Sequence, residues 1–252
     1  RIWPLYYMYM ILAIITLLAY DIQFDGLNLL WYIFLFANIP HIFGGGVFMI
    51  QHYWSLGVEE QFYAFWPWLV KKVSQANLFR VVLIITVLFF LLKSGFRVID
   101  IWYGIHKPFY TMYITRFDCM LIGALVSMLY FNNRIWFIKL STHLFTQIVS
   151  WGLIGYFVAN LQFGMSLNHE IGAIATVFII VAQVEKRNRL IILDNWVFDF
   201  LGKISYGIYV YHLLIIFYLT KVWPHYYFLP RLNIMLVYTA VFGCTVFISY
   251  LS

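Results

Sequence analysis

The chain consists of long apolar runs separated by short polar loops. A membrane-spanning helix needs about 20 largely apolar residues, with a range of roughly 17–25. The stretches that come close to this length are 4–20, 55–70, 79–95, 115–131, 143–160, 170–185, 203–222 and 232–252. These runs do not alternate apolar and polar residues as barrel strands do, and lipid offers the backbone no water, so helices are expected. The pattern predicts an all-α fold, a polytopic transmembrane helical bundle with about eight spanning helices.

One further apolar stretch, residues 27–38, is too short for a span. Basic residues recur in the loop after every second span, beginning with Lys71 and Lys72, and such loops mark the cytoplasmic side. If residues 27–38 crossed the membrane, Arg1 and the two lysines would lie on opposite sides. We therefore expect residues 21–53 to form an external excursion with one short re-entrant or interfacial helix.

The composition supports a membrane protein. Of 252 residues, 64% are hydrophobic and 10% are charged, whereas soluble domains carry about a quarter charged residues. Cytoplasmic loops explain the net charge of +6, and no basic stripe typical of nucleic-acid binding occurs. Cys119 and Cys244 both lie in apolar runs and indicate no redox compartment. Because no linker or low-complexity tract interrupts the chain, residues 1–252 are expected to form a single membrane-embedded domain.

Two carboxylates and an amide, Glu59, Glu60 and Gln61, interrupt the second predicted span. From the helical rise, Glu59 lies about 7–8 Å deep, where an ionised side chain is costly and is more often kept for function than for packing. A buried carboxyl group can act as a general acid or base, and one beside a cation can act as an orienting group. The alternative is that the carboxylates pair with arginines and only lock helices together.

A second polar position, His212, lies about 13–14 Å into its span, counted from Lys203. Ser205 and Tyr209 share its helical face. A polar stripe at that depth should face protein or water. The alternative is a histidine that a neighbouring hydroxyl satisfies without any chemistry.

Arg116 and Asp118 stand near the external start of the span 115–131. At positions i and i+2 of a helix they do not face each other, so each needs a partner elsewhere. Glu59 lies at a similar depth and is a candidate partner for Arg116. A purely structural ion pair is the alternative.

The remaining histidines near the external loops show no metal-ligand spacing, and we expect no metal site. The default expectation places them at the surface: His41, His52, His106, His169 and His225.

Four motifs keep a fixed order along the chain. The first is WSLGVEEQFYAFWP at residues 54–67. The others are Arg1 to Tyr7 at the start, Arg116 to Asp118 with Leu121 and Gly123 in the middle, and Ser205 to Tyr209 with His212 near the end. Together they resemble acyltransferase family 3, integral membrane enzymes that O-acylate, usually O-acetylate, surface polysaccharides, peptidoglycan and related acceptors. The resemblance covers essentially the whole chain, and the first motif is the specific one.

This resemblance implies an enzyme that moves an acyl group, usually acetyl, from cytoplasmic acyl-CoA to a hydroxyl of a cell-surface carbohydrate or lipid-linked glycan. It implies no bound cofactor and a place in the lipid bilayer of a bacterial inner membrane. The family core usually has ten spans, and the first carries an arginine and a histidine regarded as the catalytic base. Since the sequence begins at Arg1, we expect the chain to be truncated at the N-terminus and to lack the first two helices.

The resemblance also suggests roles for residues of this chain. We expect Glu59 to orient the acyl-transfer centre, and His212 with Tyr209 to line a route between the two faces. A cation such as Arg1 suits CoA phosphates, although snorkelling to the interface is the commoner use of such a residue. The candidate catalytic residues are Glu59, His212, Arg116 and Asp118, and the candidate substrate contacts are Arg1, Trp54, Ser55, Gln61, Tyr63 and Tyr209.

Two other classes of protein fit parts of the pattern. In a proton-coupled secondary transporter, Glu59, Asp118 and His212 would form a proton or substrate pathway, but no inverted repeat is recognisable. In a structural membrane subunit, substitutions at Glu59 or Arg116 would change assembly alone. The sequence does not indicate the oligomeric state.

Overall fold

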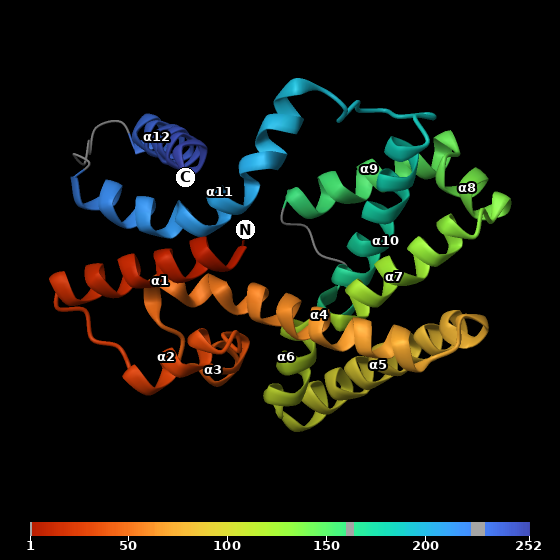
Figure 1. The fold of residues 1–252 in the computed structure, drawn as a ribbon, viewed down its shortest axis with the longest axis horizontal. Coiled ribbons are helices and arrows are strands. Elements are labelled where there is room, and N and C mark those ends of the chain that lie inside the picture. The colour runs from red at the N-terminus through yellow and green to blue at the C-terminus, as the bar shows by residue number, and fades with distance from the viewer. Residues whose placement is uncertain (1, 160–163, 223–229) are drawn as a thin grey trace. The chain divides into compact units, whose positions relative to one another are not determined.

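The computed structural model describes residues 2–159, 164–222 and 230–252, and in these ranges every regular element is helical (Figure 1). The elements are α1 (Ile2–Ala19), α2 (Gly26–Ile33), α3 (Asn38–Phe43), the 3-10 helix η1 (Phe48–Tyr53), α4 (Trp54–Lys72), α5 (Gln75–Tyr103), α6 (His106–Thr115), α7 (Phe117–Phe131), α8 (Ile135–Ser141), α9 (Leu144–Val158), α10 (Gly164–Val184), α11 (Trp196–Val222) and α12 (Pro230–Leu251). The predicted all-α fold is confirmed.

Helices correspond to all eight predicted spans, and six segments of the described chain are long and apolar enough to cross a membrane. One of these six, His106–Phe131, combines α6 and α7. The prediction of about eight spans is therefore approximate. Helix α9 has only 15 residues, and α4 carries Glu59 and Glu60 as well as Lys71 and Lys72. These charged residues make α4 less apolar than the other predicted spans.

Residues 21–53 contain two short α-helices and the 3-10 helix η1 instead of the one short helix predicted. Helix α2 has eight residues and α3 has six, so at about 1.5 Å per residue neither can cross a hydrocarbon layer of about 30 Å. The side chain of Asp25 starts α2 by accepting a hydrogen bond from the N–H of Leu27 at 2.9 Å. Gly44 ends α3 with φ at 82°, a left-handed conformation that glycine adopts without strain.

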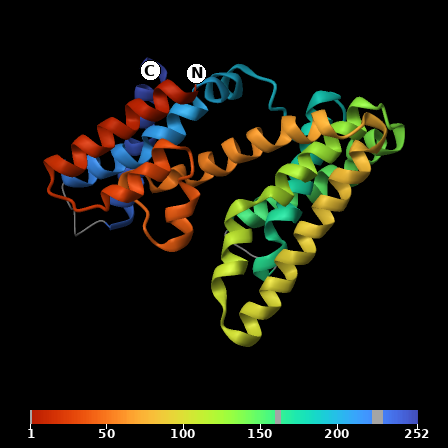
Figure 2. The ribbon, with the colours of Figure 1, turned by 60° about the horizontal axis from the view of Figure 1, so that its bottom comes forward.

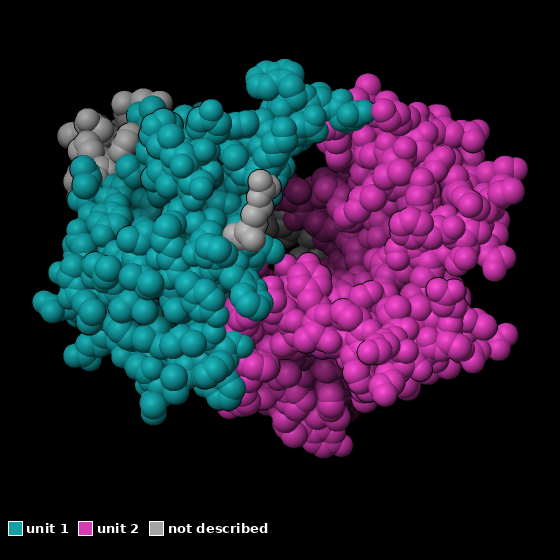
Figure 3. Space-filling model, in the orientation of Figure 1, with its two compact units in different colours: residues 1–34, 45–53, 194–252 teal, residues 35–44, 54–193 magenta. Residues whose placement is uncertain are grey.

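The chain divides into two compact units, each assembled from separate segments (Figure 3). The first unit comprises residues 1–34, 45–53 and 194–252. Within it, α1 runs beside α11, and α11 packs against α12 (Figure 2). A Cβ atom on Gly207 of α11 would lie 2.9 Å from the Cβ of Ser249 in α12. A glycine at position 207 therefore allows these two helices to approach closely.

The second unit comprises residues 35–44 and 54–193. Helices α5 and α7 pack side by side, and α10 packs against both α7 and α9 (Figure 2). Side chains of α4, α5 and α7 form its buried apolar cluster: Phe62, Leu69, Val82, Leu121 and Leu125. This packing brings polar side chains of α5, α7 and α10 together inside the unit.

Candidate functional site

A buried charged cluster joins three helices of the second unit. The ammonium Nζ of Lys93 in α5 donates to Oε1 of Glu170 in α10 at 2.7 Å and to Oδ2 of Asp118 in α7 at 3.2 Å. The three side chains are only 2%, 8% and 3% exposed, respectively. Buried charges are tolerated when they are paired and hydrogen-bonded. The expectation that Asp118 has a partner elsewhere in the chain holds, and the partner is Lys93.

Sequence reasoning missed Lys93 and Glu170, which it left inside apolar spans. The signal was present, because an ionisable residue within a predicted span is unusual. The pairing of Lys93 with Glu170 could not be identified without knowing how the helices pack, because 77 residues separate the two along the chain.

Two further side chains adjoin this charged cluster. The ring of His169 in α10 lies over that of Tyr113 in α6, with centroids 4.2 Å apart. Lys93 Nζ lies 5.8 Å from the Tyr113 centroid. His169 Nδ1 and Glu170 Oε2 are buried and make no hydrogen bond within the described part of the chain. His169 thus lies on a helix against the charged cluster, contrary to the expected surface position.

Arg116 occupies the junction between α6 and α7 in a left-handed conformation, with φ at 48°. Such a φ is uncommon for a residue with a Cβ atom and persists where the surrounding structure enforces it. The carbonyl of Arg116 accepts from the N–H of Cys119 at 3.1 Å, which starts α7. The helix of the predicted span 115–131 therefore begins at Phe117, directly after a break at Arg116.

The side chain of Arg116 contacts the first residue of α4. Its guanidinium carbon lies 5.2 Å from the ring centroid of Trp54, and the ring of His41 stacks on the same indole at 5.4 Å. A guanidinium within about 6 Å of an indole gains a cation–π attraction. Trp54, predicted as a substrate contact, therefore also positions Arg116.

Glu59 does not pair with Arg116. Among the described residues, no cationic side chain lies within 4 Å of the Glu59 carboxylate, and the side chain is half-buried beside Glu60. The candidate pairing is wrong because Arg116 turns to Trp54 instead. Glu59 is therefore an acidic group without a fixed cation in the described structure, a state compatible with contact to a substrate.

Gln61, predicted as a substrate contact, makes a reciprocal amide pair with Asn38 at the start of α3. Gln61 Nε2 donates to Asn38 Oδ1 at 2.7 Å, and Asn38 Nδ2 donates to Gln61 Oε1 at 3.3 Å. Nearby, a Cβ on Gly57 would lie 3.0 Å from the backbone nitrogen of Ala37. Gln61 thus joins α4 to α3. The other predicted contacts on α4 are the half-buried Ser55 and the exposed Tyr63.

The first unit contains a cluster of histidine and tyrosine rings. The ring of His52 in η1 lies 5.0 Å from that of His212 and 5.2 Å from that of Tyr209, both in α11. The Tyr209 hydroxyl hydrogen-bonds to the backbone carbonyl of His52. His212 Nδ1 lies 2.6 Å from the Tyr209 carbonyl oxygen. The predicted pair of His212 and Tyr209 is thus joined by a third residue, His52, which was expected at the surface.

Burial decides the protonation of His52. Both ring nitrogens are inaccessible to solvent and make no hydrogen bond of ordinary geometry within the described residues. Burial, with a smaller effect from His212, lowers the pKa of His52 to about 3, and the nearby carbonyl of Val210 opposes this only in part. The imidazole is therefore neutral near pH 7 and can accept a hydrogen bond.

Tyrosine hydroxyls hold the segment that carries His52. Tyr9 of α1 donates to the carbonyl of Met49 at 2.9 Å, and Tyr53 donates to the carbonyl of Tyr6 at 3.2 Å. Tyr6 in turn donates to the carbonyl of Tyr32 at 2.8 Å. The bonds of Tyr9 and Tyr53 tie η1 to α1, and the bond of Tyr6 ties α1 to α2.

Two predicted residues, Arg1 and His225, lie outside the described residues. Within the described ranges, no three histidine, cysteine or carboxylate side chains group in a way that could hold a metal ion. The available chemistry is that of imidazole, carboxylate and cationic side chains.

The comparisons with known proteins give one match. A family model described as an acyltransferase domain matches residues 1–252. No curated protein and no solved structure matches the chain.

Proposed function

Because the chain belongs to the acyltransferase 3 family, whose model it matches from end to end, we propose that it moves an acetyl group from acetyl-CoA to a hydroxyl of a carbohydrate acceptor. The family resemblance inferred from the four motifs is confirmed. With six apolar helices of sufficient length, the protein is an integral membrane acyltransferase. The acetyl group, the CoA donor, the glycan acceptor and a bacterial inner membrane are our proposals. The observation that carries them is the family match.

In the proposed reaction, one proton moves from the acceptor hydroxyl to the CoA thiol. The acceptor hydroxyl oxygen attacks the thioester carbonyl carbon, the carbon–sulfur bond breaks, and the acceptor's proton finally resides on the CoA thiol. A site for this reaction needs a proton acceptor, a group that orients it and donors for the oxyanion. We assign the residues of this chain to orientation and substrate contact.

In the first unit, we propose that His52, His212 and Tyr209 line the path of the reacting groups. Since burial keeps His52 neutral, its ring suits hydrogen bonding to a hydroxyl better than holding a full positive charge. General bases work best with a pKa near the operating pH. His52 is therefore assigned a positioning role, and His212 lies close enough to share it, with ring centroids 5.0 Å apart.

In the second unit, we propose that Glu59 contacts the substrate and that Arg116 supplies a positive charge beside Trp54. Glu59 has no fixed cation among the described residues, so its carboxylate can bind a hydroxyl or a cationic group. Asp118 is assigned a supporting role, because it starts α7 next to Arg116 and is bound by Lys93. Arg1 remains a proposed contact for CoA phosphates.

The test is acetyl-CoA-dependent labelling of an acceptor by membranes that contain the full-length gene product. We expect labelled acceptor from the wild-type protein and a large loss with Glu59→Gln. Glu60→Gln is the matched control, since it removes the adjacent charge on another face of α4. If Glu59→Gln membranes contain normal protein levels and label the acceptor fully, Glu59 has no part in the reaction.

A proton-coupled transporter is the second candidate, because the buried Lys93, Asp118 and Glu170 resemble the ionisable groups of a proton pathway. Uptake of a glycan precursor into sealed vesicles, driven by a pH gradient and independent of acetyl-CoA, would favour this function. Acceptor labelling without such uptake would exclude it.

A further inference from the structure

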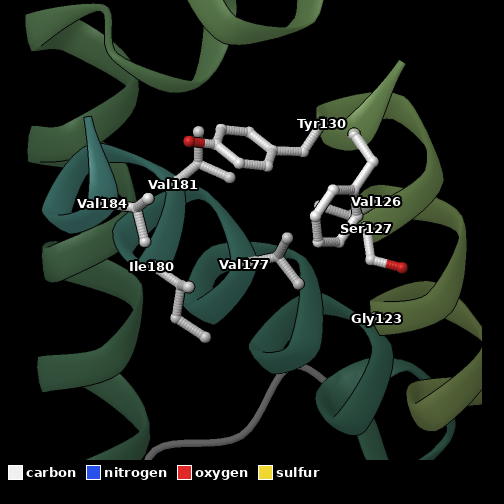
Figure 4. A pocket seen from close by; sticks show the side chains of 9 residues that line it. Gly123, Val126, Ser127, Tyr130, Val177, Ile180, Val181 and Val184 are labelled. Carbon is white, nitrogen blue, oxygen red and sulfur yellow. The ribbon is translucent and has the colours of Figure 1, made fainter. Parts of the chain in front are cut away.

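An apolar groove of about 200 Å³ lies between α7 and α10 in the second unit. In Figure 4, Val126 and Tyr130 of α7 face Val177 and Val181 of α10 across it. Its outer edge is accessible, since Phe131 and Val184 are both more than half exposed. On a membrane helix, such a surface faces hydrocarbon. The groove therefore suits an apolar chain and offers almost nothing to a polar ligand.

Gly123 keeps the deep end of the groove open. It lies within α7, its φ is not positive, and a Cβ atom built there would meet nothing within 4 Å. Neither backbone conformation nor a close helix approach requires glycine at this position. The absent side chain leaves space that a larger residue would fill. From Gly123 to Phe131 the groove extends about 12 Å along α7.

Basic residues lie at one end of the groove, directly after the last residues of α7 and α10. The backbone N–H of Arg134 donates to the carbonyl of Leu129 at 3.1 Å, and that of Arg187 donates to the carbonyl of Ala182 at 3.2 Å. Both side chains therefore start within about one helical turn of the groove, and both are exposed.

One carboxylate also lies at this end. Glu185 accepts a hydrogen bond from the Tyr130 hydroxyl at 2.7 Å, which joins the ends of α7 and α10. Two exposed arginines, Arg134 and Arg187, lie at the same end as this carboxylate. The end of the groove therefore favours an anion.

We propose that this groove binds one acyl chain of an anionic glycerophospholipid, with the lipid phosphate near Arg134 and Arg187. The apolar lining of the groove would bind the acyl chain, and the cations at its end would select a negatively charged headgroup. Each basic residue at the membrane surface raises the affinity for anionic lipids by about fivefold. The bound lipid covers the seam between α7 and α10.

The proposal can be tested by photocrosslinking in nanodiscs that contain the full-length gene product. The probes are phosphatidylglycerol and phosphatidylcholine with a diazirine on the acyl chain, used at equal mole fractions. We expect phosphatidylglycerol to label peptides containing Val126 and Val177 several-fold more than phosphatidylcholine. Gly123→Leu should abolish this labelling, because the new side chain fills the groove.

The control is Gly152→Leu on α9, another helical glycine with open space around its Cβ position, which should leave labelling unchanged. Ile180→Trp fills the groove from α10 and serves if Gly123→Leu does not fold. Arg134→Gln combined with Arg187→Gln should remove most of the several-fold preference for phosphatidylglycerol, because each lost cation lowers the attraction of an anionic lipid.

Three results would overturn the proposal. Equal labelling by the two lipids would show that the groove does not select a headgroup. Full labelling of a folded Gly123→Leu or Ile180→Trp protein would place the lipid elsewhere. A crosslink from the groove to a second copy of the chain, in place of lipid, would make it a protein interface.

Discussion

The ammonium of Lys93 lies 2.7 Å from the carboxylate of Glu170, although 77 residues separate them in the chain. Asp118 binds the same ammonium from a third helix. One cation thus holds α5, α7 and α10 together inside a lipid-facing protein. The arrangement balances one positive charge against two carboxyl groups, so loss of the cation is the most disruptive single change.

We predict that Lys93→Met destabilises the protein by about 3–5 kcal/mol, the usual effect of leaving buried charges unpaired. The measurement is the unfolding free energy in detergent. Lys139→Met, which removes an exposed lysine of α8, should change it by less than about 1 kcal/mol. The triple variant Lys93→Met, Asp118→Asn and Glu170→Gln should recover much of the loss. If the triple variant is no more stable than Lys93→Met, unpaired charge is not the cause.

At Arg116 we predict an unusual order of substitutions. In most helical positions glycine is less stable than alanine by about 1 kcal/mol, but the positive φ of Arg116 costs alanine about 1–2 kcal/mol. Arg116→Gly should therefore be more stable than Arg116→Ala by about 1 kcal/mol in denaturant unfolding. Both variants should lose acetyl transfer, because both lack the cation beside Trp54. The opposite order of stability would mean that the left-handed turn is not present.

For the amide pair we predict a structural role. Gln61→Leu leaves the Asn38 side chain, which is 4% exposed, without its partner, at a cost of about 1–3 kcal/mol. The double variant Gln61→Leu with Asn38→Leu should cost less than the sum of the single variants. If Gln61 instead contacts substrate, Gln61→Leu will raise KM for the acceptor while stability stays unchanged. Thermal unfolding and acceptor kinetics on the same samples separate the two roles.

The pKa of His52 leads to a prediction about pH. Burial lowers it from 6.5 to about 3, so between these values the unfolded chain binds a proton that the folded protein does not. The stability contributed by the neutral ring is complete above about pH 6.5 and falls as the pH falls toward 3, by at most about 1.4 kcal/mol per pH unit. His52→Phe should remove this part of the slope. An unchanged slope in the variant would show that other groups cause it.

The helices were predictable because apolar runs of span length are a strong signal in a membrane protein. Interruptions of helices were less predictable. No adjacent glycine or proline marks the break at Arg116. The apolar stretch 27–38 was predicted to hold one short helix, whereas residues 26–43 contain two. The local pattern of apolar and polar residues predicts burial well. It does not predict where tertiary packing forces a residue into a left-handed backbone conformation.

The site was only partly predictable. Motif residues such as Trp54, Arg116 and Asp118 lie within one unit, as do His212 and Tyr209 in the other. Their partners Lys93, Glu170 and His52 were missed, since each is identified by packing across distant segments and not by spacing. The expected pairing of Glu59 with Arg116 failed because depth alone does not fix the direction of a side chain.

The tyrosine hydroxyls that hold the segment around His52 have a consequence for the conditions under which the protein can work. Through the hydroxyls of Tyr9 and Tyr53, uncharged donors anchor this segment to α1. Ionic strength screens attractions between charges but barely affects such bonds. The segment around His52 should therefore keep its order over a wide range of ionic strength.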